Sequence, residues 1–409
     1  MDRRTLTGSP VRRWLERALL VAGSVVLGLL LSELALRLFV PTDSPLTFDL
    51  FRRLPDGQLR LQPNARRQHI HPAWNVAVAL NGDGFRDLDR PPAAGQQVII
   101  GLGDSFAFGW GVEYEESYLA RLGAALGGPN GGPRVMNAGI PGTGPSDQLP
   151  LLDTLLARRH ADVVLLGFFV GNDFSDVVEG GAAQFDVVDG LLARRGGGTS
   201  WPQRARAWVK RRSHLGQLLA RQVWAWEQRR ALAGHPQPLD TSGGSLRESV
   251  QIFLREPLPQ TLARGVADTL EQLGEMRRRT AAQGGRFVLL AIPRSIQIYE
   301  SDRRRFEATL GIDPAQWDLN RPQRILREWA ASNGVTLIDP RPALARAAAE
   351  AGGRLYYYPD AHLTAAGHRI IAEELTVYFR NSASDSLPTM SEAPSEATDR
   401  RPALKARNP

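Results

Sequence analysis

Residues that could carry out acyl transfer lie at two distant places in the chain. Ser105 follows an apolar run in the segment IIGLGDSFAFGWG, residues 99–111. Near the other end, the segment YYYPDAHLTAAGH (356–368) places Asp360 and His362 two residues apart. A serine hydroxyl attacks an acyl carbonyl when an imidazole takes its proton and a carboxylate orients that imidazole. These residue types predict Ser105 as nucleophile, His362 as base and Asp360 as the acid that orients the base.

Two further segments supply hydrogen-bond donors for an oxyanion. Gly139 lies in VMNAGIPGTG (135–144), just past an apolar segment, and a glycine there lets the backbone approach a ligand and direct its N–H toward it. Asn172 lies in FFVGNDFSD (168–176), where its side-chain amide can donate. The contiguous Gly-Asn-Asp of this segment leaves open whether Asn172 or Asp173 points inward.

Each segment also has an ordinary structural interpretation. Gly-Asp-Ser and Gly-Asn-Asp are common in turns, and an exposed histidine before a helix is usually a surface residue. The shared position favours chemistry, because each segment follows a predicted strand and the carboxyl ends of parallel strands converge at one edge of a sheet. His368, six residues after His362 within a helical pattern, is an alternative base.

The elements that would position these residues are short apolar strands alternating with helices. The predicted strands are 97–103, 134–139, 161–170, 286–293 and 334–340. Their continuous apolar character indicates burial on both faces, which is typical of a parallel sheet. Helical patterns lie near 116–126, 146–159, 262–282, 321–332 and 364–380. This alternation predicts a three-layer α/β sandwich.

The stretch from Ala18 to Val40 is apolar and long enough to cross a membrane as a helix, which takes about 20 residues. Glu33 and Arg37 interrupt it four residues apart, so they share a helix face and can pair. No small-residue cleavage site closes the stretch, which favours an uncleaved anchor over a removed signal peptide or a buried core helix. By the positive-inside rule, the basic residues before it place 1–17 in the cytoplasm and the body of the protein outside: Arg3, Arg4, Arg12, Arg13 and Arg17.

Composition excludes several other kinds of site. The chain of 409 residues has no cysteine, which removes disulfides, cysteine nucleophiles and thiolate metal sites. Three further histidines are not spaced as a metal cluster, and we interpret His71, His160 and His214 as structural or surface residues. The net charge of +7 is modest for this length and no nucleic-acid-binding motif is present, which argues against a nucleic-acid partner.

The sequence divides into an anchor (18–40), a connector, one large domain and a tail. In the connector (41–96), VAVALNGDGFRD (76–87) predicts a hairpin or the end of a strand. The large domain (97–380) contains an insertion (174–260) longer than a strand crossover needs. Its basic, Trp-rich residues 201–232 have helical spacing; they form a lid, a surface against the membrane, or two helices that cap the sheet edge. Residues 381–409 carry few large apolar side chains and are predicted to be disordered.

The order of the four segments resembles the SGNH, or GDSL, hydrolase superfamily over roughly residues 97–380. The matching residues are Gly103-Asp104-Ser105, Asn137-Ala138-Gly139, Gly171-Asn172-Asp173 and Asp360-Ala361-His362. The anchored amino end and LNGDGFRD are similar to membrane-anchored bacterial members. Two features depart from the usual pattern: the third segment lacks a spacer residue, and the Asp lies two rather than three residues before the His.

The resemblance implies a flavodoxin-like sheet of five parallel strands and a hydrolase that needs neither a metal ion nor an organic cofactor. It implies that the N–H groups of Ser105 and Gly139 and the amide of Asn172 hold the oxyanion. We therefore expect an esterase that acts on O-acyl groups of an acylated small molecule or of cell-envelope polysaccharide. Alternatives are an O-acyltransferase of exopolysaccharide assembly and a non-catalytic binding protein that retains the fold. The acyl group, the alcohol and the oligomeric state stay open.

Overall fold

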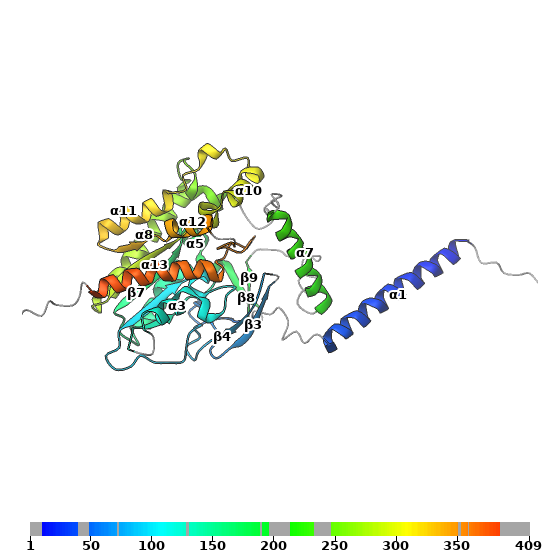
Figure 1. The fold of residues 1–409 in the computed structure, drawn as a ribbon, viewed down its shortest axis with the longest axis horizontal. Coiled ribbons are helices and arrows are strands. Elements are labelled where there is room, and N and C mark those ends of the chain that lie inside the picture. Colours follow the sequence, from blue (N-terminus) through cyan, green and yellow to red (C-terminus); the bar gives the residue numbers. More distant parts are fainter. Residues whose placement is uncertain are drawn as a thin grey trace, which may run out of the picture.

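The computed structural model describes residues 10–39, 49–71, 73–127, 131–188, 190–195, 213–232, 247–350, 353–358 and 360–384. Its centre is a five-stranded sheet with the order β11-β10-β7-β5-β6, in which all neighbours pair in parallel (Figure 1). The strands are β5 (Val98–Gly103), β6 (Arg134–Asn137), β7 (Val163–Phe169), β10 (Arg286–Ile292) and β11 (Thr336–Ile338). Each coincides with a predicted strand, and the order is that of a flavodoxin-like sheet.

Helices cover both faces of the sheet and complete the predicted three-layer sandwich. One core contains the sheet side chains Ile100, Leu166 and Leu289, and the other contains Ile99, Leu165 and Leu290. The first is closed by α4 (Pro145–Leu156), α5 (Asp173–Glu179), α8 (Gln260–Ala282) and α11 (Arg321–Asn333). The second is closed by α2 (Ser105–Phe108), α3 (Tyr118–Ala125), α12 (Arg341–Glu350) and α13 (Ala365–Ser384). Alternate strand residues therefore serve opposite layers, which is why whole strands are apolar.

The predicted connector folds into two antiparallel hairpins. They are formed by β1 (Phe51–Arg53) with β2 (Leu59–Leu61), and by β3 (Arg66–His71) with β4 (Trp74–Ala79). The chain turns after β4 where the Asn81 carboxamide accepts hydrogen bonds from the N–H groups of Asp83 and Phe85. This agrees with the strand end predicted at 76–87.

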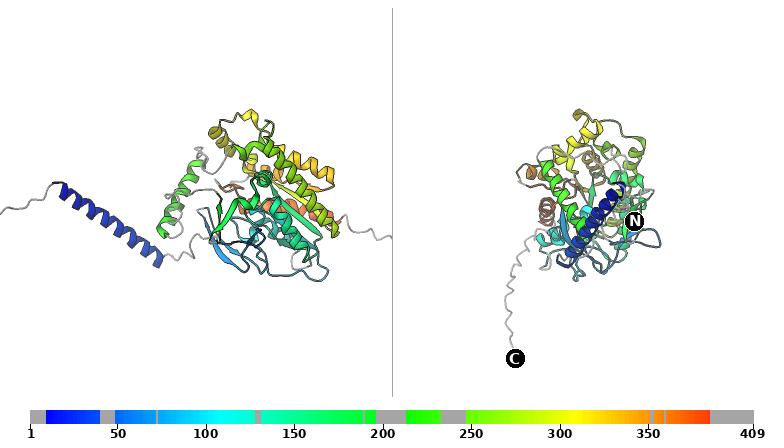
Figure 2. Two further views of the ribbon diagram at one scale, coloured as in Figure 1. Left: turned by 180° about the vertical axis from the view of Figure 1, so that it is seen from behind. Right: turned by 90° about the vertical axis from the view of Figure 1, so that its right-hand side faces the viewer.

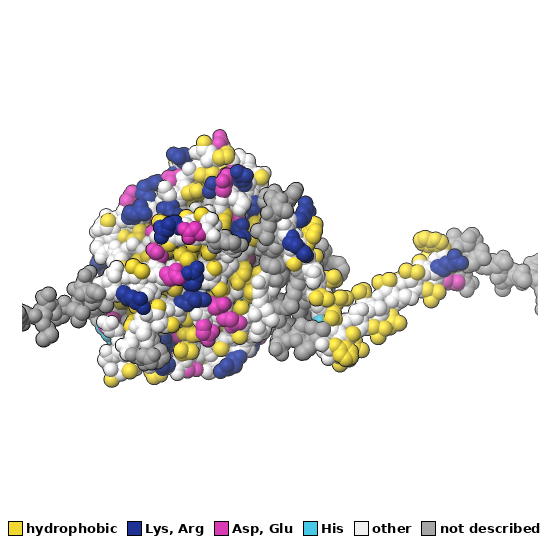
Figure 3. Space-filling view, in the orientation of Figure 1, with side chains coloured by type: hydrophobic (Ala, Val, Ile, Leu, Met, Phe, Trp, Pro, Cys, Tyr) yellow, Lys and Arg dark blue, Asp and Glu magenta, His cyan; other side chains and the backbone are white. Residues whose placement is uncertain are grey.

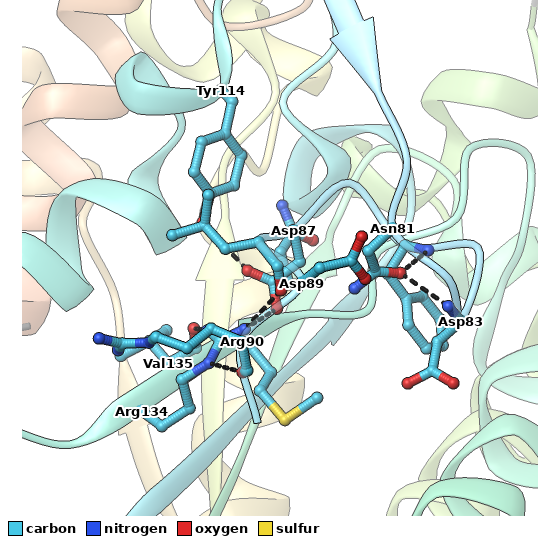
Figure 4. Close-up of polar contacts among 12 residues, drawn as sticks. Asn81, Asp83, Asp87, Asp89, Arg90, Tyr114, Arg134 and Val135 are labelled. Carbon is cyan, nitrogen blue, oxygen red and sulfur yellow. Dashed lines mark hydrogen bonds and ion pairs between the residues drawn. The ribbon is translucent and has the colours of Figure 1, made fainter. Parts of the chain in front are cut away.

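A buried ion pair fastens this N-terminal extension to the sheet (Figure 4). Asp87 Oδ2 lies 2.6 Å from Nη2 of Arg134, the first residue of β6, and the Tyr114 hydroxyl donates to Oδ1 of Asp87 at 3.0 Å. Both charged side chains are almost fully buried, so removing one partner would leave an uncompensated charge. The extension is thereby fixed to the strand neighbouring β5.

The insertion contains a hairpin of β8 (Phe185–Val188) and β9 (Leu191–Arg194), the helix α7 (His214–Leu232), and the 3₁₀ turns η3 (Gly181–Gln184) and η4 (Glu248–Phe253). Of the two helices considered for 201–232, α7 is present, whereas residues 201–212 lie outside the described part. The predicted pattern also has no counterpart for α2, α12, η1 (Tyr114–Glu116), α9 (Ser295–Ile298), α10 (Glu300–Leu310) and η5 (Pro314–Gln316).

The first helix, α1 (Pro10–Phe39), projects away from the sheet on the side of α7 (Figures 1 and 2). Its segment Trp14–Phe39 is long and apolar enough to cross a membrane, and its large apolar side chains are exposed along its length (Figure 3). The predicted pair is present, with Arg37 Nε 2.9 Å from Glu33 Oε1. Glu33 also accepts hydrogen bonds from the backbone N–H groups of His214 and Leu215 at the start of α7.

The last described element, α13, continues to Ser384, four residues past the predicted end of the large domain at 380. The remainder of the predicted tail, from 385 onward, lies outside the described residues.

Candidate active site

Ser105 is placed by a sharp turn at the carboxyl end of β5. Gly103, the last residue of the strand, has a φ of 145°, and a Cβ there would lie 2.8 Å from the carbonyl oxygen of Gly167. Only glycine fits both conditions. Asp104 then caps α2 by accepting a hydrogen bond from the N–H of Phe106 at 2.9 Å, and Ser105 begins the helix.

The structure brings the predicted nucleophile, base and acid into one hydrogen-bonded chain. Ser105 Oγ lies 2.8 Å from Nε2 of His362, and His362 Nδ1 lies 2.6 Å from Oδ1 of Asp360. The backbone N–H of His362 also donates to the same carboxylate oxygen at 3.2 Å. Between acid and base, Ala361 adopts a left-handed conformation with a φ of 69°. The two-residue spacing therefore suffices, because this turn points both side chains in the required direction.

The carboxyl group of Asp360 is held in its ionised form. Burial raises its pKa, but the hydrogen bond and the charge of His362 outweigh burial, so that the pKa lies below its usual range. An ionised carboxylate at Nδ1 fixes the tautomer in which Nε2 accepts the serine proton, and it stabilises the imidazolium that forms.

Two of the three predicted oxyanion donors, the Gly139 N–H and the Asn172 amide, are hydrogen-bonded to protein groups. The Gly139 N–H donates to Oδ1 of Asn137 at 3.0 Å. Nδ2 of Asn172 donates to Oδ2 of Asp176 at 2.9 Å, which occupies one of its two hydrogens. Gly139 also packs against the nucleophile helix, since a Cβ there would lie 2.4 Å from the backbone nitrogen of Phe108.

Asn172 and Asp173 differ in burial. Asp173 is fully buried and accepts a hydrogen bond from the N–H of Phe169, whereas Asn172 is half-buried. Burial raises the pKa of Asp173 well above its usual value, and burial also raises the pKa of Asp104 to about 6. Asp104 directly precedes Ser105, and its charge also raises the pKa of Asp173.

His368 and the three histidines interpreted as structural or surface residues have other partners. His368 is buried, accepts a hydrogen bond from the N–H of Tyr118 at 3.3 Å and stacks on the Tyr118 ring, so the structure does not favour it as the base. His71 stacks on Trp74, His160 lies 3.5 Å from Asp162, and His214 begins α7. Among the described residues, no group of three or more His, Asp or Glu side chains is arranged to hold a metal ion.

Residues 102–370 match the model of the GDSL-like lipase/acylhydrolase family. The chain belongs to this family. The match covers all four segments read from the sequence and confirms the resemblance that they indicate.

Several solved structures are similar to this chain. The esterase EstA from Pseudoalteromonas sp. is 13% identical, with 71% of this chain and 100% of that chain covered and a TM-score of 0.37. TesA is 15% identical, with 70% and 99% covered and a TM-score of 0.35. The acetylxylan esterase Axe2 from Geobacillus stearothermophilus is 12% identical, with 70% and 94% covered and a TM-score of 0.36. No curated protein matches the chain.

In this GDSL-family chain, a cavity of about 410 Å³ opens beside the Ser105–His362 pair. Its other lining residues are Phe51, Trp110, Pro141, Gly142, Leu191 and Leu192. None of the six is predicted by the sequence pattern. Only Trp110 could have been indicated by its place in the sequence, because it follows Ser105 by five residues. The centroids of the Trp110 and His362 rings are 5.7 Å apart. The others come from the extension, the second βα loop and the insertion, whose positions no local pattern shows.

The LNGDGFRD segment contributes a buried arginine that holds the loop carrying Trp110. Arg86 is 1% exposed and donates to the carbonyl oxygens of Gly109 (2.5 Å) and Val112 (2.7 Å), and to that of Ala77 in β4 (2.9 Å). Burial lowers its pKa to about 10, which leaves it charged at neutral pH. The segment therefore does more than end a strand, because it connects the extension to the wall of the active site.

Proposed function

We propose that this protein is a membrane-anchored serine esterase that cleaves O-acyl esters, with Ser105 as nucleophile, His362 as base and Asp360 as orienting acid. The observation that carries the proposal is the continuous hydrogen-bonded chain from the Ser105 hydroxyl through both nitrogens of His362 to Asp360. Membership of the GDSL-like lipase/acylhydrolase family supports a hydrolase that acts on ester bonds.

The reaction follows from these contacts. His362 Nε2 takes the Ser105 proton as Oγ attacks the ester carbonyl, and the tetrahedral intermediate collapses when His362 protonates the leaving alcohol. A water molecule then loses its proton to His362 and attacks the acyl-serine, which releases the carboxylic acid and regenerates the hydroxyl. The oxyanion is held by the N–H groups of Ser105 and Gly139 and by the Asn172 amide, through its second hydrogen or after it leaves Asp176.

We further propose that α1 anchors the enzyme and that its body lies outside the cytoplasm. The apolar segment Trp14–Phe39 and the arginines that precede it support this orientation. The alcohol portion of the substrate would then belong to the cell envelope, with acylated polysaccharide as the expected candidate.

Hydrolysis of p-nitrophenyl esters by the full chain in lipid nanodiscs tests the proposal. We expect Ser105-dependent release of p-nitrophenol, abolished in Ser105→Ala and retained in Ser332→Ala, an exposed serine whose hydroxyl contacts only its own helix. Equal rates for Ser105→Ala and the unchanged chain would exclude Ser105 as the nucleophile.

A further inference from the structure

The cavity beside Ser105 has one wall built from segments outside the family's sheet. Phe51 belongs to β1 of the N-terminal extension, and Leu191 and Leu192 belong to β9 of the insertion. Phe51 is 4% exposed and both leucines are partly buried, so these side chains face the interior of the molecule. The shape of this wall is therefore a property of this chain rather than of the sheet that carries the nucleophile.

Hydrogen bonds join the two segments into a single wall. The N–H of Phe51 donates to the carbonyl oxygen of Gly190 in the β8–β9 turn at 2.9 Å. Arg53 donates to the carbonyl oxygens of Ala182 and Phe185 at 2.9 and 2.5 Å. A Cβ at Gly190 would lie 2.9 Å from the backbone oxygen of Asp49, so glycine allows this close approach. The hairpin is thus held in place and does not depend on the substrate to position it.

The floor of the cavity is kept open by a second glycine. Gly142 has a φ of 77°, which favours glycine, and a Cβ there would lie 3.0 Å from Cδ1 of Leu192. Gly142 therefore lines the cavity beside Leu192 without a side chain of its own.

The lining determines what can fill the cavity. Apart from Ser105, His362 and the indole N–H of Trp110, the lining side chains offer only apolar atoms or, at Gly142, no side chain. Sugar hydroxyls placed against these groups would lose their hydrogen bonds to water without replacement, which is costly. A hydrocarbon chain gains free energy there, because its apolar surface leaves water.

The volume distinguishes between short and longer acyl groups. An apolar cavity of about 150 Å³ holds a benzene ring, with its six carbons. The cavity here, at about 410 Å³, is far larger than the two carbons of an acetyl group need. We propose that it is an acyl-chain site and that the enzyme prefers esters of apolar acyl chains of about six carbons or more over acetate esters. This rests on the proposed function and specifies its substrate class.

The test measures kcat/KM for p-nitrophenyl acetate, butyrate, hexanoate and octanoate with the full chain in lipid nanodiscs, which avoids free detergent chains as competitors. We expect kcat/KM to rise about fourfold for each methylene buried until the cavity is filled. A kcat/KM that does not change with acyl-chain length, or that is highest for the acetate ester, would overturn the proposal.

A pair of tryptophan variants links the preference to the cavity. Leu192→Trp narrows the cavity and should lower the hexanoate-to-acetate ratio of kcat/KM by about tenfold or more. Val377→Trp, at a position of α13 that is 60% exposed and does not line the cavity, should leave the ratio unchanged. If Leu192→Trp does not fold, Leu192→Ala provides a second test, since a wider cavity should move the optimum toward longer chains.

The outcomes separate this inference from the function on which it rests. Ser105-dependent hydrolysis with no chain-length preference, or a ratio that both tryptophan variants change equally, would overturn the acyl-chain site and leave the esterase intact. Hydrolysis that persists in Ser105→Ala, or is absent from the folded chain for all four esters, would overturn the proposed function and the acyl-chain site together.

Discussion

The two halves of the active site differ in how far they are assembled before a substrate binds. On the base side, Ser105, His362 and Asp360 are already joined by contacts of 2.8 and 2.6 Å. On the oxyanion side, the Gly139 N–H donates to Asn137 and the Asn172 amide donates to Asp176. The groups for proton transfer are therefore in place, whereas two of the three predicted oxyanion donors, the Gly139 N–H and the Asn172 amide, have protein partners that a substrate must replace or share.

This difference has a local structural cause. The base side is fixed by a short turn with a left-handed alanine, a conformation that costs about 1–2 kcal/mol and persists because the turn is hydrogen-bonded on both sides. The oxyanion side lies in loops after β6 and β7, where nearby polar side chains can reach the same donors. We expect substitutions on the base side to abolish turnover and those on the oxyanion side to reduce it by smaller factors.

The largest expected effect is that of His362→Ala. Without the imidazole, nothing takes the Ser105 proton, and we expect kcat for p-nitrophenyl esters to fall by about 10⁴- to 10⁶-fold. His160→Ala, which removes an exposed histidine at the far end of the sheet, is the matched control and should retain full activity. Comparable activity in the two variants would show that His362 is not the base that takes the Ser105 proton.

Asp360→Asn should have the next largest effect. The amide keeps the size of the side chain but cannot hold His362 in the tautomer that accepts the serine proton, so we expect kcat to fall by about 10³- to 10⁴-fold with little change in KM. A loss confined to KM would mean that Asp360 contributes to substrate binding instead.

Asn172→Ala tests the oxyanion side. Loss of one oxyanion donor reduces kcat by about 10²- to 10³-fold. Asp176→Ala removes only the partner that orients this amide, and we expect a loss of about three- to tenfold, the worth of one net hydrogen bond. If Asp176→Ala instead raises kcat, Asp176 sequesters the amide rather than orients it.

The smallest effect on turnover is expected for Asp104→Asn, which acts on stability. Burial raises the pKa of Asp104 to about 6, above its usual value near 4, so its protonated form is favoured on folding. The protonated Asp104 carboxyl group contributes to the free energy of unfolding below about pH 4, and this contribution is lost as the pH rises through about 6. Asparagine keeps the acceptor for the Phe106 N–H without the charge.

Asp104→Asn should therefore raise the free energy of unfolding above pH 6 by at most about 3 kcal/mol, and less at pH 4.5. Thermal unfolding followed by tryptophan fluorescence at the two pH values measures this difference. Equal destabilisation at both values would contradict the assignment of a raised pKa to Asp104.

The sequence was sufficient to predict the sheet and to bring the candidate site residues to one of its edges, because both depend on local signals. Each strand is a continuous apolar run, and Ser105, Gly139, Asn172 and His362 follow such elements at the edge where parallel strands converge. The membrane-spanning candidate and the Glu33–Arg37 pair were predicted for the same reason, since helical spacing is local.

The cavity and its supports could not be predicted because they depend on contacts between distant segments. Phe51 and Leu192 meet only through the folding of the extension against the insertion, and Arg86 acts on carbonyl groups more than 20 residues away. The partners of the oxyanion donors are also invisible in the sequence. Asp176, four residues after Asn172, accepts a hydrogen bond from the Asn172 amide. The position of Asn172 in the sequence alone assigns that amide to the substrate.

The most direct test of the central claim is covalent labelling of the full chain in lipid nanodiscs with a fluorophosphonate, followed by peptide mass spectrometry. The account predicts one adduct per chain on Ser105, with a labelling rate that falls by orders of magnitude in His362→Ala because the base is lost. No adduct on the folded chain, an adduct on another residue, or an unchanged rate in His362→Ala would contradict it.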